Sequence, residues 1–181
     1  MKRCELVAHP RKQKWAVACT SSALGAPESA LVGVAFTPAF EIVFDTFRAS
    51  RKVVNIQRDS GISFFIGGWS DGDEQTVQYE GVADFPQSEE LGLVKASYFA
   101  VFPEGRKRES GPGTVYVRAK PTWIRYSNLN GPRAIVQEFA LLCSARSGVF
   151  AVTAPNLITH EAAACRPTTQ VGGNLGDKSY G

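Results

Sequence analysis

Apolar and polar residues alternate over much of the chain, which is the pattern of half-buried β-strands. Alternation, clearest at residues 14–20, and short strand-like runs between turn formers at residues 28–36, 41–46, 62–69, 76–85 and 114–127 together predict six or seven short strands in meander order. The last of these runs is expected to break or bend at Pro121, because proline cannot donate a ladder hydrogen bond. The pattern therefore favours a mainly β protein.

The period changes in two places, each of which predicts a helix. Residues 51–58 place Val53, Val54 and Ile56 among polar side chains. Residues 88–102 begin with acidic residues that suit a helix N-terminus, and they repeat apolar residues along one face, at Leu91, Val94, Tyr98 and Val101. A short opening helix is expected to close at Pro10, and residues 103–113 are expected to form a polar loop.

Six strands in meander order with two inserted helices predict a six-stranded antiparallel Greek-key barrel rather than a βαβ fold. We expect one barrel domain over residues 1–130. Residues 134–143 are compatible with a strand or a helix, and turn formers dominate from about Thr153. Residues 131–181 are therefore interpreted as a C-terminal extension that is partly disordered.

Composition and charge narrow the class of partner. The 181 residues carry a net charge of only +3, which gives no general surface for nucleic acid. No apolar run approaches the roughly 18 residues that a membrane-spanning helix needs. The four cysteines are scattered without the close pairs of a zinc site. We expect a cytoplasmic protein with reduced thiols that binds neither nucleic acid nor membrane.

Motifs for self-contained catalysis are missing from the sequence. The two histidines are His9, near the start, and His160, in the expected extension, so a nucleophile with a histidine base is improbable. The sequence has no HExxH motif and no P-loop. We expect no metal site and no catalytic side chain of the usual kind, and infer that any chemistry depends on a bound cofactor.

The segment "FDTFRASRKVVNIQRD" places cations where a helix disfavours them. Ser50 is a natural N-cap, but Arg51 and Lys52 then fall in the first turn, where the helix dipole opposes positive charge. A phosphate group would offset this, because it accepts bonds from helix N–H groups, hydroxyls and cations together. Thr46 could donate one more hydroxyl. The plainer alternative is a capping serine with two solvated cations.

Three further side chains are candidates for contact with a flat ring. Gln78 faces opposite to Val77 and Tyr79 on its strand, and it suits either a ring edge or solvent. Trp123 and Arg125 share one strand face, which offers a stacking plane beside a cation, or simply a core tryptophan with a surface arginine.

The chain from about Trp15 to Asn128 resembles the FMN-binding split β-barrel proteins related to pyridoxamine 5′-phosphate oxidase. The resemblance rests on "ESALVGVAF", "EIVFDTFRASRKVVNIQRD", "TVQYEGVADF", "YFAVFPEG" and "PTWIRYSN", in that order. It implies a homodimer with two flavin sites between the subunits. It also implies a clamp for the flavin phosphate made by Thr46, Ser50, Arg51 and Lys52. The residues that it implies beside the flavin ring are Val32, Gly33, Val34 and Gln78. It also implies that Trp123 and Arg125 reach the partner's cofactor.

The resemblance implies an FMN-dependent oxidoreductase that acts on a small molecule not identified by the sequence. The arginine that pyridoxamine phosphate oxidases carry in the second-strand motif is replaced here by "SALVGV". Two alternatives stay open. One is an F420-dependent reductase, for which Arg106, Lys107 and Arg108 could meet a longer anionic tail. The other is a module that binds flavin or heme without turnover.

Overall fold

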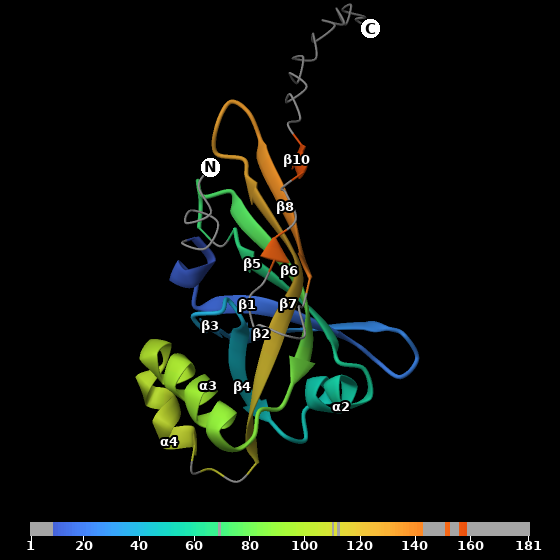
Figure 1. The fold of residues 1–181 in the computed structure, drawn as a ribbon, viewed down its shortest axis with the longest axis vertical. Helices are drawn as coiled ribbons and strands as arrows, with labels where there is room; N and C mark the ends of the chain where they lie inside the picture. Colours follow the sequence, from blue (N-terminus) through green and yellow to red (C-terminus); the bar gives the residue numbers. More distant parts are fainter. Residues whose placement is uncertain are drawn as a thin grey trace, which may run out of the picture.

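The computed structural model describes residues 9–68, 70–109, 111, 113–142, 151–152 and 156–158. Within them the chain forms ten strands, β1 Trp15–Ser21, β2 Pro27–Gly33, β3 Ala35–Phe36, β4 Ile42–Phe47, β5 Gly61–Gly67, β6 Gln75–Asp84, β7 Thr114–Asn128, β8 Ile135–Leu142, β9 Ala151–Val152 and β10 Asn156–Ile158. The helices are α2 Arg51–Arg58, α3 Ser88–Val101, the 3-10 turn η1 Pro103–Gly105 and α4 Arg106–Glu109. Figure 1 shows α2 on one side of the sheet's lower half and α3 with α4 on the other.

All strand pairs are antiparallel, and their order is β10-β8-β7-β6-β5-β1-β2, with β4 joined to the lower half of β7. The sheet curls so that its two ends, β2 and β4, approach each other. No hydrogen-bonded ladder joins β2 to β4 among the described residues. The result is a barrel that is split along one seam, and the predicted mainly β, split-barrel fold is confirmed.

Strand β7 connects the barrel to an outer extension of the sheet. Its first half, Thr114–Ala119, pairs with β4, and its second half, Trp123–Asn128, pairs with β8. Pro121 does not divide it into two strands, because the ladder to β6 shifts register there and leaves Thr122 as an extra residue. This β-bulge bends the strand without ending it.

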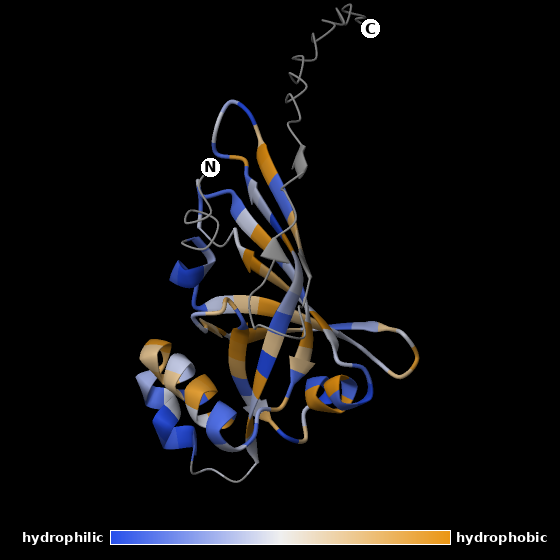
Figure 2. Cartoon of the chain, viewed as in Figure 1, coloured by the Kyte–Doolittle hydropathy of each residue, from blue (hydrophilic) through white to orange (hydrophobic). Residues whose placement is uncertain are grey.

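The inward faces of six strands, β1, β2 and β4–β7, supply most of the larger core, which also takes in Ile56 of α2 and Phe139 of β8. Alternating colours along the strands and both colours on α2 in Figure 2 reflect the period that predicted them. A second cluster lies under α3, where Val94, Tyr98 and Phe99 pack against Val43 and Tyr116. Both predicted helices are confirmed.

Two expectations about local structure are wrong. The predicted strand at 28–36 breaks at Val34, where the chain leaves β1 and turns to pair with β4 as β3. The predicted loop at 103–113 contains η1 and α4. Arg106 stacks over the Phe99 ring at 4.7 Å, and this contact helps to hold the short helix against α3.

Near its ends the chain differs from the expected extent of one helix and decides one open choice of element. Residues 9–12 are helical, so the opening helix does not close at Pro10, and its earlier residues lie outside the described part. Beyond residue 130 the sheet continues into β8, which resolves the choice between strand and helix there. Most of the predicted extension 131–181 lies outside the described residues. Within those residues, no helix combines the length and apolar character that crossing a membrane requires.

Gly81 gives a test of the bulged ladder. A Cβ atom at this position would lie 2.4 Å from the backbone oxygen of Lys120, so a Gly81→Ala variant must shift the strand. We expect a loss of about 1–3 kcal/mol in the free energy of unfolding, measured with urea. Gly92→Ala, in the open interior of α3, is the control and should stabilise by about 0.5–1 kcal/mol. Equal effects of the two changes would contradict this account of the bulge.

Candidate functional site

The predicted clamp residues meet where β4 passes into α2. Thr46 lies near the end of β4, Ser50 is the N-cap of α2, and Lys52 lies in its first turn. The hydroxyls of Thr46 and Ser50 are 3.3 Å apart, and Lys52 Nζ donates to Thr46 Oγ1 at 3.2 Å. Three of the four predicted clamp side chains therefore form one hydrogen-bonded group.

The entrance of α2 is left open to an anion. Ser50 occupies the cap position, but its side chain makes no hydrogen bond to the helix N–H groups, and the first turn contains no acidic residue. The first N–H groups of a helix have no acceptor within the helix, and they carry its positive end. The Val53 N–H already donates to the Ser50 carbonyl at 3.0 Å. The earlier N–H groups of the turn, the two hydroxyls and Lys52 together make a local positive site.

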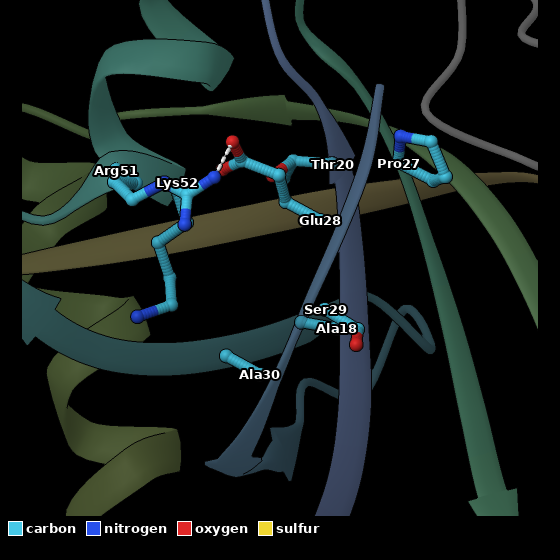
Figure 3. Close-up of a pocket in the computed structure, with 8 residues that line it drawn as sticks. All are labelled: Ala18, Thr20, Pro27, Glu28, Ser29, Ala30, Arg51 and Lys52. Atoms are coloured by element: carbon cyan, nitrogen blue, oxygen red, sulfur yellow. Dashed lines mark hydrogen bonds and ion pairs between the residues drawn. The ribbon is translucent and has the colours of Figure 1, made fainter.

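Arg51, the fourth clamp residue, is held elsewhere. Its guanidinium pairs with Glu28 of β2, as Figure 3 shows. The hydrogen bond from Arg51 is the largest cause that lowers the pKa of Glu28 below its usual value, so this carboxyl is anionic at neutral pH. Glu28 Oε2 also accepts from Asn55 of α2 at 2.9 Å. The sequence analysis did not identify Glu28 as a site residue. Glu28 lies four residues before Val32 on β2, so both side chains point to the inner face of the sheet.

Two cavities adjoin the clamp, each of about 480 Å³. The first is lined by Ala18, Thr20, Pro27, Glu28, Ser29, Ala30, Arg51 and Lys52. The second lies at the seam of the barrel and is lined by Leu31, Val32, Gly33, Asp45, Thr46, Phe47, Lys52, Arg108, Gly111 and Thr114. Lys52 is common to both, so it stands between them. We call the second one the seam cavity.

A polar network contributes to the lining of the seam cavity. Asp45 accepts hydrogen bonds from the Tyr98 hydroxyl at 2.7 Å and from Arg108 Nε at 3.2 Å. Burial is the main cause that raises the pKa of Tyr98, and the Asp45 carboxylate raises it further, so the phenol stays protonated and donates. Bonding to Asp45 raises the pKa of Arg108 as well. Arg108 is thus fixed beside the cavity by the partly buried Asp45.

The predicted ring contacts on β2 divide between cavity and core. Val32 and Gly33 line the seam cavity, whereas Val34 is fully buried in the core and does not. A Cβ atom on Gly33 would lie 2.9 Å from the Phe102 ring, so close packing already explains why glycine occurs there.

The remaining candidates lie on the outer face of the sheet. Arg125 is in register with Gln78, and this row continues through Phe65 and Val17 to Leu31. Trp123 lies two residues before Arg125 on β7, on the same face of the sheet, where it pairs with Glu80. Neither cavity beside the clamp is lined by Gln78, Trp123 or Arg125. Within one chain the structure therefore does not bring these three residues to the clamp.

No family model matches the chain, and no curated protein matches it significantly. Among solved structures, a pyridoxamine 5′-phosphate oxidase-related FMN-binding protein from Nostoc punctiforme superposes with a TM-score of 0.62 at 12% identity, over 86% of this chain and 94% of that one.

Two heme proteins are similar as well. A heme binding protein from Mycobacterium smegmatis gives a TM-score of 0.63 at 16% identity over 75% of this chain, and the match covers 58% of that protein's own length. A heme storage protein from Vibrio cholerae gives 0.57 at 15% identity, over 66% of this chain and 89% of that one. The chain thus has the split β-barrel fold of the pyridoxamine 5′-phosphate oxidase-related proteins, and this fold includes both FMN-binding and heme-binding members.

Two tyrosines near the seam cavity offer a matched test of its polar network. The Tyr98 hydroxyl donates to the charged Asp45, whereas the buried Tyr116 hydroxyl has no hydrogen-bond partner within the described structure. We expect Tyr98→Phe to lower the free energy of unfolding by about 1–3 kcal/mol and Tyr116→Phe to leave it unchanged or to raise it slightly. Chemical denaturation of both variants measures this, and a larger loss for Tyr116→Phe would refute the assignment.

Proposed function

We propose that the protein binds FMN, with the phosphate at the β4–α2 corner and the ring in the seam cavity. The observation that carries this proposal is the hydrogen-bonded group of Lys52, Thr46 and Ser50 at an uncapped helix entrance. A dianionic phosphate is the ligand that such a set of donors suits best.

The seam cavity is consistent with the rest of the flavin. Its wall on β2 includes Leu31 and Val32, and apolar walls with a few polar groups are usual for ligand sites. Arg108, fixed by Asp45, supplies a donor in the same cavity. When bound, FMN supplies the electron-transfer chemistry of an oxidoreductase, while these residues hold and orient it.

The lining of the cavities weighs against heme. Protein ligands to heme iron are usually histidine, cysteine, methionine or tyrosine. None of the residues that line the two cavities beside the clamp is of these types. His9, the histidine within the described residues, lines neither. An absorption spectrum of the freshly purified protein separates flavin from heme directly.

An F420-type deazaflavin is the alternative cofactor to FMN. It is supported by Arg108, a cation proposed to bind its longer anionic tail, which lines the same cavity as Lys52. Of the other two cations proposed for its tail, Arg106 is engaged with the Phe99 ring. Parallel titration with FMN and F420 decides between them.

A homodimer would give the outer sheet face a role. Leu31 and Phe65, which are 62% and 39% exposed, lie in one row with Gln78 and Arg125. Since Gln78, Trp123 and Arg125 do not reach their own chain's clamp, they could contact a flavin only across a subunit interface. We propose that this face pairs with a second copy and completes its site.

Removing the clamp lysine should weaken FMN selectively. We expect Lys52→Gln to raise the Kd for FMN about tenfold or more, because a hydrogen bond to a charged group contributes about 1.5–3 kcal/mol. Riboflavin lacks the phosphate, so its Kd should not change. Quenching of flavin fluorescence measures both constants.

Lys107→Gln, on the exposed side of α4, is the matched control and should bind FMN as the unmodified protein does. If Lys52→Gln affects FMN and riboflavin equally, the phosphate is not at this corner.

A charge on the outer face should separate the subunits. We expect Phe65→Glu to give a particle of one chain mass, 19.6 kDa, in light scattering, and to lose FMN affinity. Leu93→Glu introduces the same charge on α3, where Leu93 is 66% exposed, and should remain dimeric. A monomeric unmodified protein, or an unaffected Phe65→Glu dimer, would exclude this interface.

A further inference from the structure

The clamp contains an anion of its own. Glu28 pairs with Arg51, one of the two clamp cations, and the pair lines the cavity on the far side of Lys52 from the seam. The Arg51 side chain is 81% exposed, whereas that of Glu28 is only 16% exposed. The arginine is therefore the partner that is free to move.

Glu28 does not depend on Arg51 for its position. Its second carboxylate oxygen accepts from Asn55 Nδ2 at 2.9 Å. Asn55 is itself buried, at 5% exposure, and also donates to Thr20 Oγ1 at 3.0 Å. If Arg51 turned away, Glu28 would keep a hydrogen bond and its place on β2.

Lys52 is arranged differently from its neighbour. In Figure 3 its side chain extends away from Glu28, and its Nζ donates to Thr46. One clamp cation is thus paired only with a neutral hydroxyl, while the other is already neutralised by a carboxylate. A phosphate at this corner meets Lys52 directly but must displace a carboxylate to recruit Arg51.

We propose that Glu28 competes with the ligand phosphate for Arg51 and so sets the affinity of the site for phosphorylated ligands. This inference rests on the proposed phosphate site and adds a residue that determines its specificity. Only a ligand with enough negative charge can take Arg51 from Glu28, which favours a dianionic phosphate monoester over a ligand without phosphate. Because the exchange of Arg51 offsets part of the binding energy, the phosphorylated ligand binds less tightly than it would without Glu28.

The test is a titration of the Glu28→Gln variant, which keeps an amide oxygen for Asn55 and removes the charge. We expect its Kd for FMN to fall about two- to fivefold at low salt, in the range of exposed ion pairs. The Kd for riboflavin should be unchanged. The gain for FMN should shrink at high salt, because the screening length falls from about 30 Å at 0.01 M to about 3 Å at 1 M.

Glu90→Gln is the matched control. Glu90 also pairs with an arginine, Arg118, at 3.0 Å, but that arginine keeps its bonds to Asp84 when Glu90 is neutralised, and Glu90 lines neither cavity beside the clamp. It should leave both flavin affinities unchanged.

A second variant keeps the inference testable should Glu28→Gln fold poorly. Arg51→Gln should weaken FMN less than Lys52→Gln does, because the contribution of Arg51 is reduced by the ion pair that it must break. Circular dichroism melting of each variant confirms that it is folded before titration.

Each outcome decides the question. Weaker or unchanged FMN binding by folded Glu28→Gln, or a loss in Arg51→Gln equal to that in Lys52→Gln, overturns the competition while the FMN site stands. A gain that riboflavin shares overturns it too. If neither the unmodified protein nor Glu28→Gln binds FMN, the proposed function and this inference both fail.

Discussion

The structure depends on the seam between β2 and β4, where no backbone hydrogen bonds join the two strands among the described residues. A single antiparallel sheet curls until β2 and β4 face each other. In the same part of the chain, the backbone ladders of β2 run to β1 and those of β4 to β3 and β7. Side chains occupy the gap, and a cavity remains there. The site follows from the topology, because the seam brings the end of β4, the start of α2 and the inner face of β2 together.

In the described part of the chain, three cations line the two cavities beside the clamp. Lys52 lines both cavities. The Arg51–Glu28 pair lines the first cavity with it, and the Arg108–Asp45 pair lines the seam cavity with it. Two of the three cations are balanced by carboxylates of the same chain, and Lys52 is balanced by none within the described contacts. The local electrostatics therefore single out one side chain, which could not be inferred from the net charge of +3.

Much of the fold could be predicted because its signals are local. Alternation, together with short runs of apolar and aromatic residues, identified β1, β4, β5 and β6, and the period of 3.6 identified α2 and α3. The break at Val34 was missed, since it depends on which strand each half pairs with, and apolar residues continue through it. The sequence left open whether the run at 114–127 breaks or bends at Pro121, and the structure shows a bend, because the bulge is a property of the ladder with β6.

The part of the site whose residues lie in one short segment of the sequence could be predicted. Thr46, Ser50 and Lys52 come together as the sequence indicates, since a strand end and a helix start are separated by only a short turn. Glu28 could not be placed there without knowing that β2 faces β4, because it meets Arg51 only after the sheet curls. The Asp45–Arg108 pair could not be foreseen because it forms only where α4 packs beside β4, 63 residues along the chain.

The seam also bears on how chains behave toward one another. Strand β2 ends the order of the sheet, so one of its backbone edges has no strand partner within the described part of the chain. Unprotected edges of this kind are templates for aggregation, and Pro27 and Glu28 at the start of β2 are residue types that discourage it. Anything that fills the seam covers this edge as well, so occupancy should also protect the protein's solubility.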